Sequence, residues 1–410
     1  MSHKVICHPT DLRAIRLCEL YTPVVNDTPV VKAMQKRILI VGIGFAGAVH
    51  ARTLAAAGMN VHLIDRRSHI GGNAYDYVDK NGIRIHAYGP HLFHTKNERV
   101  LQWIRQFADF VLYTHRVRAL LPNGNYAPLP INLDTVNMVL GADCETAEDV
   151  NELLAKVAIP IEAPRNAGEY LYSRIGLKLT DLFFRPYTRK MWSLDLEDMS
   201  AAVVARIPIR ASRLDTYFPD DEVQILPRRG YTELFRSILD HPRITVDLNI
   251  SFEKTLLRDF DYCFNSMAID EYFDLRLGEL PYRSIRFHTR TIASQGNRGW
   301  AVTNFTDFRP FTRETAWHEL PFHKAEDSSV ETRTVEEPCD YKENSYERYY
   351  PVRTADERYQ KIYKKYRELA TREANVQFIG RCGTYQYLDM DQVINQSLAS
   401  AERWLASQGE

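Results

Sequence analysis

The sequence predicts an α/β protein in which one nucleotide-binding domain is built from early and late parts of the chain. The early part, residues 37–73, has an apolar run, a glycine-rich turn, an alanine-rich stretch and a second apolar run that ends in an acid. Residues 135–192 have a mainly helical pattern, whereas residues 283–293 and 300–306 alternate as antiparallel strands do. A late strand and helix start at 376–390 indicate that the chain then returns to the first domain.

The early part has the order of a Rossmann-like strand–helix–strand unit with a Gly-x-Gly-x-x-Gly turn. Gly42 allows the tight turn, Gly44 lets the backbone approach a pyrophosphate, and Gly47 lets the helix pack close to the strand. Amides at the helix start attract phosphates. Asp65 ends the second strand, where an acid binds a ribose hydroxyl. A purely structural turn is the alternative, and the flanking strands and the acid argue against it.

A glycine pair just after Asp65 favours a flavin over a nicotinamide cofactor. Gly71 and Gly72 would let the backbone lie against the same pyrophosphate from the other side. This pattern resembles the FAD-binding two-dinucleotide-fold flavoproteins, so we predict FAD as the cofactor. The cofactor-binding residues predicted in this stretch are Gly42, Gly44, Phe45, Ala46, Gly47, Asp65, Arg66, Gly72 and Asn73.

Composition limits the functions that remain. The 410 residues predict two or three domains, and a net charge of −1 argues against a nucleic-acid binder. The six cysteines form no CxxC pair, which predicts free thiols, a cytoplasmic protein and no metal site. Residues 1–36 resemble neither a secretory signal nor a flavin motif, and Met34 could be the natural start. No apolar run is long enough to span a membrane.

Further along the chain, histidines cluster after a short predicted strand. His86 ends this strand, and His91 and His94 lie in a loop that contains glycine and proline. We favour a loop over the flavin ring, since no acidic partner for a metal lies close in sequence. For His86, a packed histidine is an equally supported interpretation.

The helical segment ends in a stripe of aromatic residues. Phe183, Tyr187 and Trp192 recur near helical spacing, which is typical of a buried core face. Arginines and a lysine interleave with them, and this favours stacking of a base beside an anionic diphosphate.

The remaining pattern predicts helices at 97–108, 230–240 and 355–373, a hairpin at 114–129, and strands at 244–247 and 262–266. The fold class is therefore an FAD-binding Rossmann-like domain with an inserted helical domain and an antiparallel β-sheet domain. The predicted FAD-binding segments are 37–95, 228–280 and 355–410. The predicted helical insertion is 131–200, and the predicted sheet domain comprises 96–130, 201–227 and 281–354.

From Arg37 to about Leu398, the assembled motifs resemble the UDP-galactopyranose mutase family. They include the stretches that end at Asn73 and Thr95, Tyr187-Thr188 with Trp192, Arg206-Ile207-Pro208, Asn304 to Asp307, Tyr349 to Val352 and Asp389-Met390. The resemblance implies bound FAD that is active when reduced. It also implies that a nucleotide sugar is isomerised between pyranose and furanose forms, as in galactofuranose-containing polysaccharide biosynthesis.

The resemblance also implies roles for individual residues. Arg206 and Arg313 would clamp the diphosphate, and two planar bidentate donors suit its concentrated charge. The implied catalytic residues are Arg206, Arg313, His91 and His94. The implied substrate-binding residues are Phe183, Tyr187, Trp192, Tyr217, Asn304, Tyr350, Tyr387 and Asp389. Arg381 and Met390 complete the expected cofactor-binding set.

The chemistry expected of such a protein needs no side-chain nucleophile, and no motif for one occurs. Reduced flavin N5 would attack the anomeric carbon as the diphosphate leaves, and a covalent adduct would then allow ring opening and reclosure. We expect a reductant such as NAD(P)H or a reductase, a homodimer, and a mobile loop between Trp192 and Tyr217.

Three departures from the family pattern lie near the expected sugar pocket. They are Ser193, Pro90 and the stretch Glu314 to His318. They leave open a different UDP-sugar or a dTDP-sugar. An FAD-dependent oxidoreductase of the amine-oxidase type and a non-catalytic flavin-binding protein also remain as alternatives.

Overall fold

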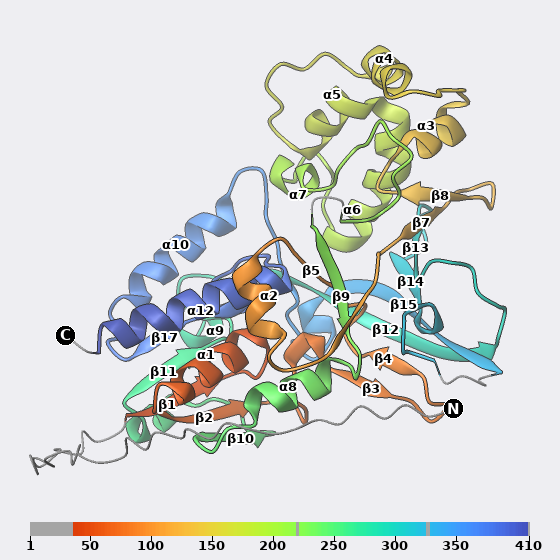
Figure 1. Cartoon of the computed structure of the whole chain (residues 1–410). Helices are drawn as coiled ribbons and strands as arrows, with labels where there is room; N and C mark the ends of the chain where they lie inside the picture. The colour runs from red at the N-terminus through yellow and green to blue at the C-terminus, as the bar shows by residue number, and fades with distance from the viewer. Residues whose placement is uncertain (1–35, 219–220, 325–328, 409–410) are drawn as a thin grey trace, which may run out of the picture. The chain divides into compact units, whose positions relative to one another are not determined.

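The computed structural model describes residues 36–218, 221–324 and 329–408 (Figure 1). The prediction that Met34 is the natural start lies outside these residues. Within the described ranges, no helix combines the length and the apolar character needed to cross a lipid bilayer.

A parallel sheet of five strands contains the strands of the predicted nucleotide-binding unit. From edge to edge its strands are β10 (Ile244–Leu248), β2 (Asn60–Asp65), β1 (Arg37–Val41), β11 (Tyr262–Asn265) and β17 (Val376–Phe378). Strands from the start, middle and end of the chain therefore share one sheet. This confirms the predicted α/β fold class, while the finer division into domains stays a prediction.

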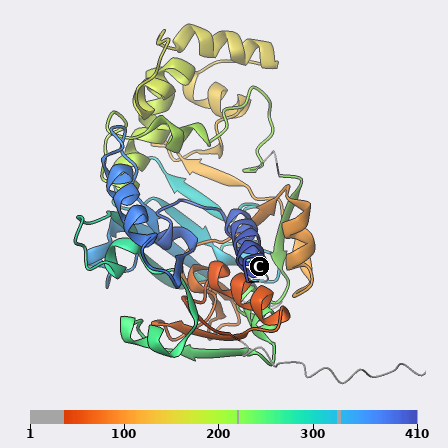
Figure 2. The same ribbon diagram turned by 90° about the vertical axis from the view of Figure 1, so that its left-hand side faces the viewer.

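The side chains of successive residues of β1 point to opposite faces of this sheet, as expected for a strand that is buried on both sides. Ile38 and Ile40 pack in a core with helices on one face, and Leu39 packs in a second core on the other. The first face is covered by α1 (Phe45–Ala56), α8 (Tyr231–Leu239) and α12 (Met390–Ala406). The second is covered by α9 (Ile269–Tyr272) and α10 (Arg358–Ala370). Figure 2 shows α12 beside α1.

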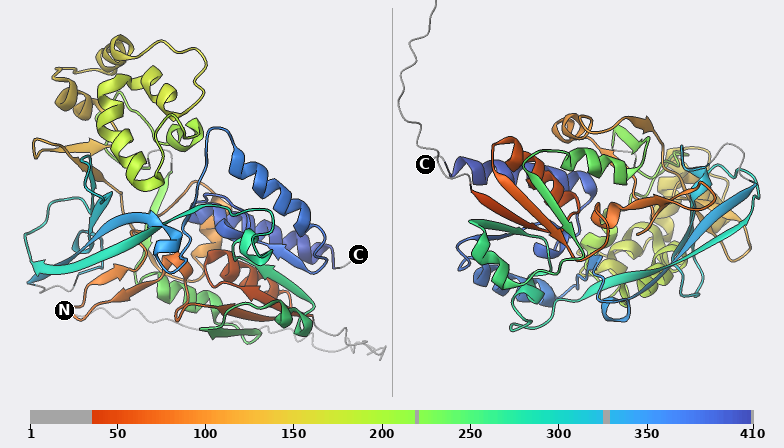
Figure 3. Two further views of the ribbon diagram at one scale, coloured as in Figure 1. Left: turned by 180° about the vertical axis from the view of Figure 1, so that it is seen from behind. Right: turned by 90° about the horizontal axis from the view of Figure 1, so that it is seen from below.

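A seven-stranded sheet forms the second layer. In order, its strands are β16 (Tyr350–Pro351), β12 (Tyr282–Ala293), β15 (Val330–Asp340), β14 (Arg313–Ala316), β13 (Val302–Phe305), β7 (Val117–Leu120) and β8 (Tyr126–Leu129). Neighbouring strands are antiparallel except β13 and β7, which are parallel. The long strands β12 and β15 lie side by side from Arg283 opposite Asp340 to Ala293 opposite Val330 (Figure 3).

The helical segment has its own hydrophobic core. Its elements are α3 (Leu133–Leu140), α4 (Ala147–Val157), α5 (Ala167–Leu179), the π-helical turn η2 (Thr180–Phe184), α6 (Arg185–Trp192) and α7 (Ala201–Ala205). Asn132, Thr146 and Asn166 each cap a helix by accepting a hydrogen bond from a backbone amide three residues later. The last helix, α6, packs against β15 and so links this core to the large sheet.

Shorter elements connect these layers. A two-stranded sheet pairs β3 (Asp76–Val78) with β4 (Arg84–His86), and a three-stranded sheet contains β5 (Phe93–Thr95), β9 (Val223–Pro227) and β6 (Phe110–Leu112). The remaining helices are α2 (Glu98–Ile104) and α11 (Gly380–Gly383). The 3-10 turns are η1 (Gly72–Ala74), η3 (Lys254–Asp259), η4 (Trp317–Glu319) and η5 (Tyr341–Glu343).

Candidate functional site

The nucleotide turn, Gly42 to Gly47, has no room for side chains at its two ends. Gly42 has a φ of +94°, and a Cβ there would lie 2.0 Å from the Ser266 hydroxyl. A Cβ on Gly47 would lie 2.0 Å from the Gly42 carbonyl oxygen. The glycine pair predicted to face this turn does so, because a Cβ on Gly72 would lie 2.8 Å from Gly44 Cα. Two glycine loops therefore meet backbone to backbone, which is the cradle that a dinucleotide pyrophosphate requires.

Asp65 lies at the end of β2 and is buried. Its carboxylate accepts hydrogen bonds from the amides of Ile43, at 2.8 Å, and Arg67, at 2.9 Å. It therefore ties the nucleotide turn to the strand end. A carboxylate has further lone pairs, so these bonds are compatible with the predicted ribose contact, which stays a prediction.

The segment after Asp65 is held by ion pairs. Arg66 is nearly half exposed and lies 3.1 Å from Glu347. Its neighbour Arg67 is more buried, pairs with the same carboxylate, and donates to the Asn73 side chain at 2.9 Å. The sequence pattern selected Arg66 and missed Arg67, because neighbouring arginines look alike until the fold places one of them inside.

The late strand returns to the nucleotide turn at Gly380. Its φ is +68°, and a Cβ there would lie 3.0 Å from that of Ala46. Arg381 follows directly, and its Nε donates to the Leu388 carbonyl at 2.6 Å. Phe45 and Met390 pack in the same core cluster. These contacts bring the late predicted cofactor residues to the start of α1.

Beside this junction lies an arginine–tyrosine cluster of Arg206, Arg381, Tyr350 and Tyr387. The two tyrosine rings stack with centroids 5.3 Å apart. The Arg206 guanidinium lies 4.2 Å from the Tyr387 ring centroid, and that of Arg381 lies 5.3 Å from it. The cluster thus joins residues from the end of α7, from β16 and from the segment before α12.

Two further predicted substrate residues border this cluster. Asp389 caps α12 and lies 4.0 Å from Arg206. Trp192, the last residue of α6, meets Tyr350 edge to face at 6.3 Å. The helical insertion and the large sheet therefore both contribute to the same place.

The charges in this region are arranged for an anion. Partial burial lowers the pKa of Arg206. The nearby Tyr387 and Asp389 act in the opposite direction with a larger effect, so the pKa of Arg206 is raised. Burial raises the pKa of Tyr350 to about 12, while Arg313 and Arg381 act in the opposite direction. Burial also raises the pKa of Tyr187 and Tyr217. These phenols remain protonated at neutral pH and can donate hydrogen bonds to phosphate oxygens.

Arg313 is held by a buried acid that the sequence analysis did not identify. Its Nε lies 2.8 Å from Glu336 Oε2, and the Glu336 side chain is 2% exposed. Asn304, another predicted substrate residue, is directly opposite Arg313 in the β13–β14 pair. A Cβ on Gly89 would lie 2.8 Å from Glu336 Oε1, so the histidine loop needs a glycine there. Glu336 thus connects Arg313 to the loop that carries His91.

Glu336→Gln tests what this buried charge does to stability. Burial raises the pKa of Glu336 despite the attraction of Arg313. Between its ordinary and its raised pKa, the folded state holds a proton that the unfolded state has released. The free energy of unfolding therefore falls as pH rises through that interval. We expect the variant to lose this pH dependence and to be no less stable than the wild type at neutral pH.

Urea unfolding over a pH series measures this effect. Glu337→Gln is the matched control, because Glu337 is the next residue of β15 and pairs with Arg286 and His288 at the surface. A loss of roughly 3–5 kcal/mol in Glu336→Gln at neutral pH would show instead that breaking the ion pair dominates.

The predicted catalytic histidines have different surroundings. His91 is close enough to Arg381 and Arg313 for both to lower its pKa, after burial as the main cause, to about 4. His94 points to other partners: it stacks on Phe218 with ring centroids 3.6 Å apart and pairs with Asp221. The charges of Arg381 and Arg313 therefore act on His91, whereas His94 contacts Phe218 and Asp221.

The aromatic residues of the predicted helical stripe lie in different places in the structure. Phe183 is 9% exposed and packs in the core of the helical segment, as the alternative interpretation of the stripe had it. Tyr187 packs instead with Met191 and Tyr349 beside Tyr350. Tyr217 lies near Arg313 and Arg206, both of which act on its pKa.

Comparisons with known proteins match most of the chain. The family model for UDP-galactopyranose mutase matches residues 182–387, and a model for NAD(P)-binding Rossmann-like domains matches residues 40–107. The "Probable UDP-galactopyranose mutase" of Klebsiella pneumoniae is 37% identical over 375 residues, 91% of this chain and 95% of the relative. The dTDP-fucopyranose mutase of Escherichia coli is 34% identical over 382 residues, 91% of this chain and 100% of the relative.

A solved structure of reduced UDP-galactopyranose mutase shares the fold. It superposes with a TM-score of 0.71 at 15% identity and covers 92% of this chain and 95% of its own.

Proposed function

This chain belongs to the UDP-galactopyranose mutase family of isomerases, and we propose that it interconverts the pyranose and furanose forms of a nucleotide sugar. UDP-galactopyranose and UDP-galactofuranose are the first candidates. The observation that carries the proposal is the arginine–tyrosine cluster next to the nucleotide turn. Arg381 belongs to the cluster, and the preceding Gly380 packs on Ala46 of α1. A diphosphate bound by the cluster would therefore lie beside a dinucleotide cofactor.

FAD is the cofactor that the two facing glycine loops fit. Gly42, Gly44, Gly47 and Gly72 would hold its pyrophosphate and Asp65 its ribose. When bound and reduced, a flavin supplies a nucleophilic nitrogen, N5, for the anomeric carbon. A reductant such as NAD(P)H or a reductase, a homodimeric assembly and a cytoplasmic location are proposed with it.

The residues of this chain would bind, orient and stabilise charge. Arg206 and Arg313 offer guanidinium groups to the diphosphate, whose negative charge increases as it leaves the sugar. Tyr350 and Tyr387 offer phenol hydroxyl groups beside them. The Trp192 ring, at the edge of Tyr350, would exclude water from the sugar.

The two relatives indicate which sugars and bases to compare first. The Escherichia coli relative acts on a dTDP-sugar, and its identity of 34% is close to the 37% of the Klebsiella relative. Identity therefore does not separate UDP from dTDP substrates. An amine-oxidase type of activity has less support, because arginines around stacked tyrosines suit a diphosphate better than a cationic amine.

A panel of nucleotide sugars with chemically reduced protein tests this function. We expect ring contraction of one member, with UDP-galactopyranose and dTDP-fucopyranose as the first two compared. Activity should require reduced protein and should consume no stoichiometric reductant. Product analysis by chromatography and NMR measures both points. Oxygen consumption with an amine, and no ring contraction with any member, would favour the oxidoreductase instead.

A further inference from the structure

Two buried imidazoles, those of His86 and His323, form a hydrogen-bonded chain that leads from the histidine loop into the core. The His91 backbone amide donates to His86 Nδ1 at 3.0 Å. His86 Nε2 lies 3.0 Å from His323 Nε2. His323 Nδ1 lies 2.9 Å from the Pro321 carbonyl oxygen. His86 and His323 are 1% and 2% exposed, so water cannot take the place of these hydrogen-bond partners.

The partners fix where each proton sits. The Pro321 oxygen can only accept, so His323 Nδ1 must carry a hydrogen. The His91 amide can only donate, so His86 Nδ1 must be bare. With both rings neutral, His86 Nε2–H donates to the bare Nε2 of His323, and each of the four ring nitrogens has a suitable partner.

A proton added to either ring would break this chain. It would place two N–H groups against each other, either between the rings or between His86 and the His91 amide. Arg84 faces both rings and Asp76 faces His323. Burial is the main cause that lowers the pKa of His86 well below its ordinary value and that of His323 to about 4. The pair is therefore neutral at physiological pH.

The surroundings hold this pair rigidly. The Trp317 ring lies 5.1 Å from that of His86 and is parallel to that of His323 at 6.5 Å. The His323 carbonyl accepts from the Arg84 amide at 2.9 Å, which joins its segment to β4.

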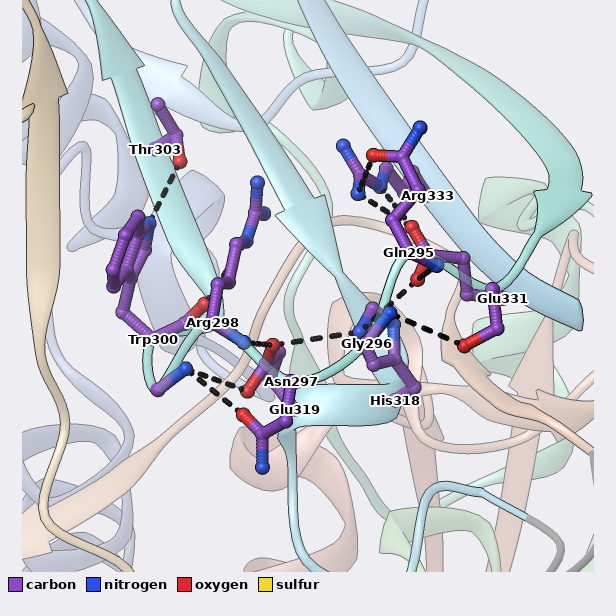
Figure 4. Close-up of polar contacts among 12 residues, drawn as sticks. Gln295, Gly296, Asn297, Arg298, Trp300, Thr303, His318, Glu319, Glu331 and Arg333 are labelled. Atoms are coloured by element: carbon purple, nitrogen blue, oxygen red, sulfur yellow. Dashed lines mark hydrogen bonds and ion pairs between the residues drawn. The ribbon is translucent and has the colours of Figure 1, made fainter. Parts of the chain in front are cut away.

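The turn before this segment is also anchored (Figure 4). Glu319 accepts from the Arg298 amide at 2.7 Å and from the Gly299 amide at 3.2 Å. His318 lies 3.4 Å from both Glu319 and Glu331. The backbone segment that carries His323 is therefore held in place.

We propose that His323, acting through His86, is a positioning residue that holds the His91 loop beside Arg313 and Arg381. His91 Nδ1 lies 2.8 Å from the Gly89 carbonyl, so Nδ1 carries the hydrogen and Nε2 is left as an acceptor. The chain of imidazoles sets the place of this acceptor. The part concerning catalysis rests on the proposed mutase function, whereas the proton arrangement does not.

Two substitutions of His323 separate positioning from simple packing. His323→Phe keeps a ring but removes the acceptor, so the buried His86 Nε2–H has no partner. The His91 amide still needs a bare Nδ1, so the His86 ring keeps its tautomer but loses the hydrogen bond that fixes its orientation. We expect kcat to fall roughly tenfold to a hundredfold with little change in KM, as for a misplaced group. His323→Gln offers an amide oxygen in place of Nε2 and should restore most of this loss.

Nitrogen-15 NMR of histidine-labelled protein reads the proton positions without any turnover. In the wild type, His86 should have a bare Nδ1 and a protonated Nε2, and in His323→Phe the proton on Nε2 should resonate further upfield because it has lost its acceptor. His288→Phe is the control, because the His288 side chain is half exposed on β12. It should change neither kcat nor the His86 signals.

The proposal fails if wild-type His86 is protonated at Nδ1, or if His323→Phe keeps normal kcat. It also fails if the phenylalanine and glutamine variants lose activity equally, since that would indicate packing alone. If the wild type isomerises no nucleotide sugar, the proposed function fails. The NMR result then decides the proton arrangement on its own.

Discussion

Arg313→Ala is expected to lower turnover of the nucleotide sugar by roughly a hundredfold or more, comparable to the loss of one charge-stabilising donor at a reaction centre. The Arg313 side chain is one-quarter exposed, and its pairing with Glu336 outweighs the cost of burial and raises its pKa. The guanidinium is therefore charged and held in place before substrate arrives. Such a preorganised donor stabilises charge as it develops without first having to reorient.

Arg313→Lys separates the charge from the shape of the group. A lysine keeps a positive charge beside Glu336, so the variant should fold normally. It offers a point charge rather than a planar fork, so it should recover only part of the activity. Steady-state kinetics with the substrate found in the panel provides the measurement. Arg309→Ala is the control, since Arg309 is half exposed and pairs with Asp307 at the surface. Normal turnover in Arg313→Ala would place the diphosphate elsewhere.

The features that the sequence predicted well are those fixed by local chemistry. The nucleotide turn follows from glycines that have no room for a Cβ, and the last helix begins at Asp389, which forms a capping box with Gln392. The clustering of Tyr350, Tyr387 and Arg206 was expected only from the family resemblance. These residues are far apart in the chain, and no periodicity connects them.

The residues that the sequence analysis missed depend on long-range contacts. Glu336 lies on β15, a strand that the pattern did not predict, and its role comes from the neighbouring strand that carries Arg313. His323 lies in a segment without a motif, and it matters because Trp317 and His86 pack against it.

The stripe in the helical segment shows a further limit of periodicity. Helical spacing assigned Phe183 and Tyr187 to one face, but the π-helical turn at Thr180–Phe184 lies between α5 and α6 and changes the phase. Phe183 therefore enters the helical core, whereas Tyr187 reaches the cluster around Tyr349.

Gly44→Val is expected to abolish FAD retention while the protein stays folded. Gly44 has a φ of −82°, which any residue can adopt, and a Cβ there would meet nothing closer than Gly72 Cα at 3.8 Å. The protein itself therefore tolerates a side chain at this position. A bound pyrophosphate would not, because the branched side chain would fill the space through which it approaches the backbone. We expect at least a hundredfold weaker binding, or about 2.8 kcal/mol.

The comparison with Gly47→Val makes this result specific to the cofactor. A Cβ on Gly47 would collide with the Gly42 carbonyl oxygen at 2.0 Å, so that variant should lose the turn itself and unfold more easily. Ala57→Val places the same branched side chain at the exposed end of α1 and should retain FAD. Flavin content after purification, titration of the apoprotein with FAD, and thermal unfolding provide the three readouts. If Gly44→Val binds FAD as tightly as the wild type, the pyrophosphate does not lie on this turn, and the position assigned to the cofactor is wrong.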